Sequence, residues 1–179
     1  MTQANGSPDG AERQVIRFED LNGRESPFHP FDMVLERFQR RRYAVVGRRT
    51  EKTATGSGPG EVDDFSVVYI AAAPGKGIGS HAHATPEVFI VMAGRWRIVM
   101  GGESPAELEV GPWDVVAVPP DVFHSAVNIG ETEGWILAIN TGGDGAPIQW
   151  DPALIAEIRA QGLTVEATEL PGAALAERP

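Results

Sequence analysis

The sequence contains no cysteine, and this absence removes several kinds of chemistry at once. A chain without thiols has no disulfide, no thiolate nucleophile, no zinc ribbon and no iron–sulfur cluster held by its own residues. Histidine is also scarce, with four residues in 179. A metal site built from this chain would therefore draw on nitrogen and oxygen ligands, and the positions of so few histidines become informative.

Basic residues and long apolar runs are also in short supply. The 15 Lys and Arg residues stand against 25 Asp and Glu residues, which gives a formal net charge of −10. An acidic chain repels phosphate backbones and anionic lipid, so we expect a small-molecule partner and neither nucleic acid nor a membrane. No stretch approaches the length of a membrane span, and the first ten residues are too polar for a signal peptide, so we expect a cytoplasmic protein.

The chain does have enough apolar material for one core, divided into short segments. Hydrophobic residues make up 42% and charged residues 22%, an ordinary globular balance that supports a single domain. Seven short runs rich in β-branched or aromatic residues are bounded by Gly, Pro, Asp or Asn: 65–73, 88–93, 96–100, 108–110, 115–118, 125–129 and 135–140. Their short connections exclude a parallel α/β fold and predict an all-β protein, with antiparallel hairpins that close into a sandwich or small barrel.

The segments on either side of these runs have a different character. Residues 1–14 are predicted to be a disordered lead, and residues 53–60 a flexible loop by composition. Residues 15–60 form an N-terminal arm, in which Phe31, Val34, Leu35 and Phe38 have a helix-like spacing and residues 43–46 resemble a strand.

The C-terminal region, residues 146–179, is predicted to contain a short helix followed by a weakly ordered tail. In residues 151–162, Asp151 is placed as an N-cap, Pro152 as the first helical residue and Gly162 just past the end.

Three of the four histidines lie in the β-rich region together with a carboxylate. His81 and His83 are two residues apart, so on a strand they point to the same face. Glu87 is an even number of residues beyond both and returns to that face if the backbone stays extended, and His124 must be brought in by the fold. Three imidazoles and one carboxylate would make a site for Fe, Mn, Ni, Co, Cu or Zn.

Two motifs around these residues resemble those of the cupins. Gly75, His81, His83, Glu87 and Gly94 match the pattern G-x5-H-x-H-x3-E-x6-G at every specified position. In the second cupin pattern, G-x5-P-x-G-x2-H-x3-N, the Pro, His and Asn positions are matched by Pro119, His124 and Asn128.

The second motif departs from the pattern at two positions. Asp121 stands where the pattern has Gly, and Gly111 is separated from Pro119 by seven residues instead of five. The first departure is mild because Asp tolerates turn conformations with positive φ better than most residues. The second predicts a longer turn before the strand and does not touch the metal ligands.

The resemblance covers about residues 65–140 and implies a double-stranded β-helix, or jelly-roll, barrel at residues 61–145. It implies that His81, His83 and His124 are metal ligands and that Glu87 is a ligand or a catalytic base. The alternative is that the histidines are surface or capping residues and Glu87 is a surface carboxylate. It also implies a homodimer, since cupin arms exchange strands between barrels. Cupins include dioxygenases, isomerases, decarboxylases, lyases, sugar-binding proteins and storage proteins, so the reaction itself stays open.

Several other side chains are candidates for lesser roles. Counting by two along the strands places Phe89, Trp96 and Met100 on the interior face, where they could line a substrate site.

His29 lies in a loop between prolines and is expected to be structural or exposed, with a role over the barrel as the minority alternative. Asn128 is expected to be a turn or hydrogen-bonding residue. A basic cluster is expected to pair with the excess carboxylates or a partner subunit, with capture of an anionic substrate as the weaker alternative: Arg37, Arg40, Arg41, Arg42, Arg48 and Arg49.

The leading hypothesis for function is a metal-dependent enzyme, an Fe(II) dioxygenase that acts with O2 on a small organic substrate that chelates the metal through oxygen. The first alternative is a non-redox isomerase or lyase in which Mn, Zn or Ni polarises a carbonyl. The second is a small-molecule binding module without enzymatic activity.

Overall fold

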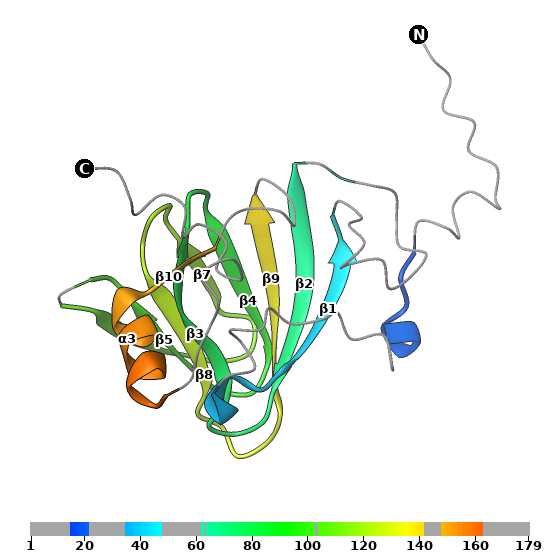
Figure 1. The fold of residues 1–179 in the computed structure, drawn as a ribbon. Coiled ribbons are helices and arrows are strands. Elements are labelled where there is room, and N and C mark those ends of the chain that lie inside the picture. Colours follow the sequence, from blue (N-terminus) through cyan, green and yellow to red (C-terminus); the bar gives the residue numbers. More distant parts are fainter. Residues whose placement is uncertain are drawn as a thin grey trace, which may run out of the picture.

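Two antiparallel β-sheets of five strands each form the body of the protein (Figure 1). The computed structural model describes residues 15–21, 35–47, 62, 64–102, 104–141 and 148–162. Sheet A has the strand order β1-β2-β9-β4-β7, and sheet B has the order β10-β3-β8-β5-β6. Because consecutive strands of the chain often lie in different sheets, the arrangement is a jelly roll, which confirms the predicted all-β fold.

The strands are short, as the sequence predicts. Those of sheet A are β1 (Arg41–Val46), β2 (Phe65–Ala72), β9 (Gly134–Thr141), β4 (Glu87–Ala93) and β7 (Val115–Val118). Those of sheet B are β10 (Ile148–Trp150), β3 (Gly77–His83), β8 (His124–Asn128), β5 (Trp96–Met100) and β6 (Ala106–Val110).

Alternate residues of the central strands face the space between the sheets and form the core. In β4, Glu87, Phe89 and Val91 are buried while Val88 and Ile90 are half-buried. This alternation is what a strand with one face against a core requires. The main core cluster draws on both sheets and includes Phe89 from β4 and Trp96 from β5, both with no exposed surface.

Apart from β1, which was predicted separately, two strands lie outside the seven predicted runs. Residues 77–83, which form β3, are rich in Gly, Ser and His, and these residues have low strand propensity. The strand forms because β8 pairs with it on one side and β10 on the other. Strand β10 has only three residues, too few to give a periodic signal.

The predicted C-terminal helix is confirmed as α3 (Pro152–Ala160). Asp151 caps it, because its Oδ1 accepts a hydrogen bond of 2.8 Å from the Ala153 amide, and its Oδ2 accepts one of 2.8 Å from the Ser80 hydroxyl of β3. Leu154 and Ile158 of the helix pack in a second apolar cluster with residues of the N-terminal arm. The helix is therefore fixed to the strand that carries two of the histidines.

The described part of the N-terminal arm contains two 3-10 helices, η1 (Phe18–Leu21) and η2 (Glu36–Phe38), followed by the predicted strand β1. Within the predicted helix-like repeat, the described residues Glu36–Phe38 form a single 3-10 turn. Phe31, Val34, the 1–14 lead, the 53–60 loop and the tail beyond residue 162 lie outside the described residues. None of the described helices is long and apolar enough to cross a membrane.

Candidate metal centre

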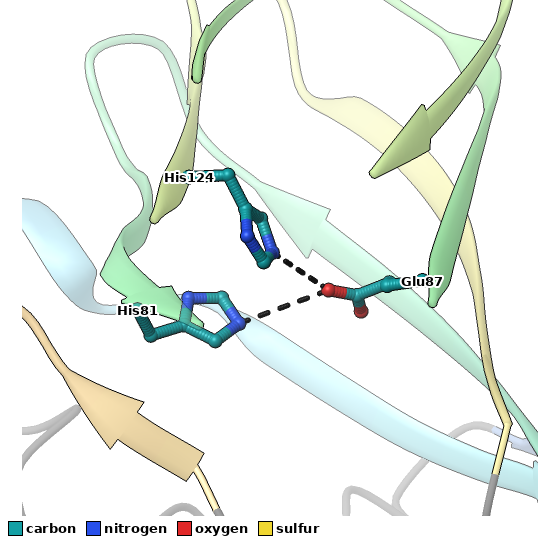
Figure 2. Close-up of side chains that lie close together, drawn as sticks. All are labelled: His81, Glu87 and His124. Atoms are coloured by element: carbon teal, nitrogen blue, oxygen red, sulfur yellow. Dashed lines mark hydrogen bonds and ion pairs between the residues drawn. The ribbon is translucent and has the colours of Figure 1, made fainter. Parts of the chain in front are cut away.

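The four predicted ligands lie close together, and Figure 2 shows three of them: His81, Glu87 and His124. His81 and His83 lie at the end of β3, Glu87 is the first residue of β4, and His124 is the first residue of β8. His81 and His124 are directly opposite each other in the β3–β8 pair, so their side chains point to the same side of sheet B. Glu87 reaches them from sheet A.

The turn between β3 and β4 fixes the position of Glu87. Thr85 Oγ1 donates a hydrogen bond of 2.8 Å to the Thr141 carbonyl, and Thr141 Oγ1 donates one of 3.2 Å to the Pro86 carbonyl. These bonds hold the start of β4 against the end of β9, its neighbour in sheet A. The turn at Pro86 therefore connects sheet B to sheet A and holds the backbone of Glu87 in place.

The turn before β8 fixes His124 in a comparable way. Asp121 has a φ of 59°, the left-handed conformation that the glycine of the second cupin pattern would adopt, and that Asp tolerates. Its backbone amide donates a hydrogen bond of 2.7 Å to the carbonyl of His83. This bond ties the turn that precedes one histidine to the residue that carries another.

The side chains converge on a single oxygen atom. Glu87 Oε2 lies 2.8 Å from His124 Nε2, 3.7 Å from His83 Nε2 and 3.8 Å from His81 Nε2. All four residues are buried, with between 1% and 9% of their surface exposed. Three imidazole nitrogens and a carboxylate thus surround one small volume.

Backbone hydrogen bonds set the orientation of two of the rings. Nδ1 of His81 lies 2.8 Å from the Gly79 carbonyl, and Nδ1 of His124 lies 2.9 Å from the Val122 carbonyl. A carbonyl only accepts, so each Nδ1 carries the proton and donates it. The Nε2 atom of each ring then faces Glu87, as in metal-binding histidines whose other nitrogen bonds to the backbone.

The protonation state of His81 makes this ring available as a metal ligand. Burial, together with the neighbouring His124 and His83, lowers the pKa of His81 well below its ordinary value, so this ring is neutral at pH 7. Because Nδ1 of His124 carries a proton, the Nε2 atom of the same ring is an acceptor unless it is protonated as well. Its contact with Glu87 Oε2 would then bring two acceptors together unless a proton or a metal ion lies between them.

The donor set fits a divalent metal. Donor atoms of His81, Glu87 and His124 all lie within 4.8 Å of one another. Two ligands that are each about 2.1 Å from the same ion are separated by at most about 4.2 Å, so small side-chain movements would suffice. His83, whose Nε2 is 3.7 Å from the same carboxylate oxygen, could supply a fourth ligand.

The predicted substrate-lining residues lie at two different levels of the barrel. Phe89 is fully buried with its ring centroid 5.7 Å from that of His124, and Met100 is the cross-strand partner of His124 in the β5–β8 pair. Trp96 is four residues away along β5, opposite Asn128, and its indole nitrogen donates to the Ala93 carbonyl. The structure therefore does not bring Trp96 to the cluster, because a two-residue period identifies a face but not a level along the strand.

The expected role of Asn128 is confirmed. Its Nδ2 donates to the carbonyls of Ala72 and Thr132, and its Oδ1 accepts from the Gly130 amide. Asn128 therefore holds the turn after β8 and lies away from the metal ligands.

Two members of the basic cluster pair with carboxylates, as expected. Arg37 bonds to Glu157, and Arg41 bonds to Glu133, each with a closest distance of 2.6 Å. The hydrogen bonds from Arg37 lower the pKa of Glu157. His29, Arg48 and Arg49 lie outside the described residues.

Two polar residues near the candidate ligands were not predicted from the sequence. Ser66 and Asn140 occupy inward-facing positions, continuing the buried series Val68 and Ile70 in β2 and Ile136 and Ala138 in β9. A polar residue in phase with a buried apolar series is the signal that could have identified them.

The comparisons with known proteins agree with this architecture. Residues 68–140 match a family model described as the cupin domain. No curated protein matches the sequence. An uncharacterized conserved protein with a double-stranded β-helix domain from Klebsiella pneumoniae superposes with a TM-score of 0.52 at 18% identity, over 76% of this chain and 100% of that one.

Two further solved structures are similar over less of this chain. KdgF from Halomonas sp. has 17% identity and a TM-score of 0.45, over 57% of this chain and 78% of that one. An oxalate decarboxylase from Lactobacillus farciminis has 14% identity and a TM-score of 0.48, over 60% of this chain and 30% of that one. Such low identities concern the fold alone. The family match and the jelly-roll topology together show a cupin domain at residues 68–140.

Proposed function

We propose that the chain is a metal-dependent cupin enzyme, an Fe(II) dioxygenase that acts on a small organic molecule able to chelate the metal through oxygen. The observation that supports it is the convergence of three imidazole Nε2 atoms on Glu87 Oε2, within 3.8 Å. A merely structural cluster would not need three imidazole rings around one buried carboxylate.

In this proposal His81, His83 and His124 hold the ion as neutral imidazoles, and Glu87 completes the ligand set or acts as a base. Bound Fe(II) would supply the redox chemistry that activates O2 and the Lewis acidity that binds a substrate oxygen. Both oxygen atoms enter the product and the substrate supplies the electrons, so the reaction needs no external reductant.

The protein's own residues would position and deprotonate the substrate. Glu87 Oε2 lies within reach of any group held between the imidazoles, which is the geometry required of a general base. The fully buried Phe89 ring, close to His124, provides an apolar wall that limits access of water to that proton.

Oxygen uptake tests the reaction class. Protein loaded anaerobically with Fe(II) is mixed with catechols, β-diketones and hydroxy-keto acids, and O2 consumption and 18O incorporation are measured. We expect uptake with at least one class, loss of at least about 100-fold in rate for Glu87→Gln, and no loss for the exposed control Glu107→Gln. Protein with a full complement of iron and no O2 uptake across the panel would contradict the dioxygenase assignment.

Two other outcomes would identify the alternatives. Turnover without O2 in protein loaded with Mn, Zn or Ni would indicate a non-redox isomerase or lyase. Tight binding of a panel compound without turnover under either condition would indicate a binding module.

A further inference from the structure

Two polar side-chain atoms near the candidate metal centre are buried without a hydrogen-bond partner among the described residues. They are Ser66 Oγ and Asn140 Oδ1, and Ser66 has only 1% of its surface exposed. Buried polar groups in folded proteins are nearly always paired, because an unpaired one loses its bonds to water and gains nothing in return. Such a pair of atoms therefore points to a partner that the described residues do not provide.

These two residues lie in one row with Glu87. Ser66 is the cross-strand partner of Asn140 in the β2–β9 pair, and Asn140 is the partner of Glu87 in the β9–β4 pair. Cross-strand partners point to the same side of a sheet, and here that side is the interior. Figure 1 shows the three strands side by side in sheet A.

The row is polar only at this end of the sheet. The next inward-facing row along the same three strands consists of Val68, Ala138 and Phe89, all of them buried in the core. Neighbouring strands lie about 4.8 Å apart, so the row extends about 10 Å from the Glu87 backbone to that of Ser66. This length matches a substrate of a few carbon atoms with one end held among the histidines.

The backbone at Asn140 is held firmly. The next residue, Thr141, exchanges hydrogen bonds with Thr85 and Pro86 in the turn that precedes Glu87. The backbone position of Asn140 is therefore fixed relative to that of Glu87, which is one requirement of a preorganised binding group.

We propose that Ser66 and Asn140 form a hydroxyl-binding subsite beside the metal centre. A substrate hydroxyl donates its proton to Asn140 Oδ1 and accepts the proton of the Ser66 hydroxyl, so that each group in the contact is satisfied. Glu87 is the only charged member of the row, which favours a neutral hydroxyl over a second carboxylate at this position. The inference rests on the proposed metal site and adds the substrate class: small molecules with a hydroxyl one or two carbons from the oxygen that chelates the metal.

A pair of probes that differ by one hydroxyl tests the subsite. Lactate and glycerate share a 2-hydroxy acid group that chelates a metal, and glycerate has one more hydroxyl on the adjacent carbon. Their affinities for metal-loaded protein are measured by calorimetry. We expect wild-type protein to bind glycerate about tenfold more tightly than lactate.

Two variants remove the subsite and one serves as a matched control. Ser66→Ala and Asn140→Leu should each reduce the glycerate preference to near one, with lactate affinity and metal content unchanged. Ser125→Ala, on the outward face of β8, should keep the preference. A wild-type protein that holds metal but binds both probes equally, or binds neither, would overturn the subsite and leave the metal centre intact. A protein that does not bind metal would instead overturn the proposed function.

Thermal stability separates a binding role from a structural one. Because the Ser66 hydroxyl satisfies no described group, Ser66→Ala should not lower the Tm of the protein without ligand. A substantially lower Tm for Ser66→Ala would show that the hydroxyl supports the fold through an internal water, and would contradict the subsite. This measurement does not depend on whether Asn140→Leu folds.

Discussion

The neutral state of His81 is the residue-level property on which the candidate metal centre depends. Its burial and the neighbouring His124 and His83 lower its pKa, and the bond from Nδ1 to the Gly79 carbonyl leaves the Nε2 lone pair toward the carboxylate. A histidine that is neutral and fixed in orientation can bind a metal without first losing a proton.

The lowered pKa of His81 predicts an acid-sensitive metal-free protein. The unfolded chain takes up a proton on this residue at a higher pH than the folded chain does. The free energy of unfolding should therefore be highest above about pH 6.5, the ordinary histidine value, and fall as the pH drops below it. Urea unfolding in the presence of a chelator measures this at about pH 7.5 and about pH 5.5.

The comparison variant is His81→Gln, which cannot titrate. It should lose less stability than wild-type protein over the same pH interval, since the unfolded chain no longer binds that extra proton. Equal losses in the two proteins would mean that His81 is not the group responsible.

At the residue scale, the two cupin patterns were sufficient to predict the candidate ligands His81, His83, Glu87 and His124. They were predictable because the spacing of the patterns reflects one strand face and one turn, which are local properties. The level of Trp96 along the barrel and the row formed by Ser66 and Asn140 depend instead on strand register, which pairs residues far apart in the sequence. A single sequence gives the phase of each strand but not its register.

Among the elements, β3 has the most direct control over the candidate site, because it carries both His81 and His83. Its glycines allow close approach to its neighbours. A Cβ on Gly77 would come within 1.9 Å of the Ala126 carbonyl oxygen in β8. No L-amino acid side chain fits there without separating the two strands.

Gly77→Ala should therefore destabilise the protein by more than about 2 kcal/mol and weaken metal binding, because β3 and β8 must move apart. Gly111→Ala is the matched control, since nothing lies within 4 Å of the added methyl group, and it should stay within about 0.5 kcal/mol of wild type. Urea unfolding and metal titration of both variants measure these effects. A Gly77→Ala protein as stable as the control would show that the β3–β8 pairing differs from the one described.

The elements differed in how well the sequence predicted them. Strands β5 and β7 have the predicted bounds, and α3 begins and ends as its capping residues indicate. Strand β3 has few residues with high strand propensity, so its conformation comes from pairing on both sides and not from local preference. Local sequence signals predict the elements whose residues favour the observed conformation by themselves. The conformation of the other elements is determined by tertiary pairing.

For the whole molecule, the excess of negative charge and the open sheet edges bear on assembly. In the described sheets the outermost strands are β1 and β7 in sheet A and β10 and β6 in sheet B. Edge strands present unpaired backbone groups that can pair with another chain. Beside β7, Trp113 is 75% exposed, an apolar surface of the kind that interfaces cover.

We therefore predict that the protein is a homodimer. Light scattering after gel filtration should give about twice the chain mass of 19.2 kDa. Salt should not dissociate the dimer if apolar and backbone contacts hold it, since screening weakens only charged contacts. A mass of one chain at micromolar concentration would contradict this prediction.

Metal content per chain tests the central claim most directly. Protein is expressed and purified without chelator, and metals are quantified for wild type, His81→Ala and the control His29→Ala, which removes the one histidine outside the candidate centre. We predict about one equivalent of divalent metal in wild type and in His29→Ala, and a loss of at least about tenfold in metal affinity for folded His81→Ala. A His81→Ala protein that keeps its full metal content would contradict the account.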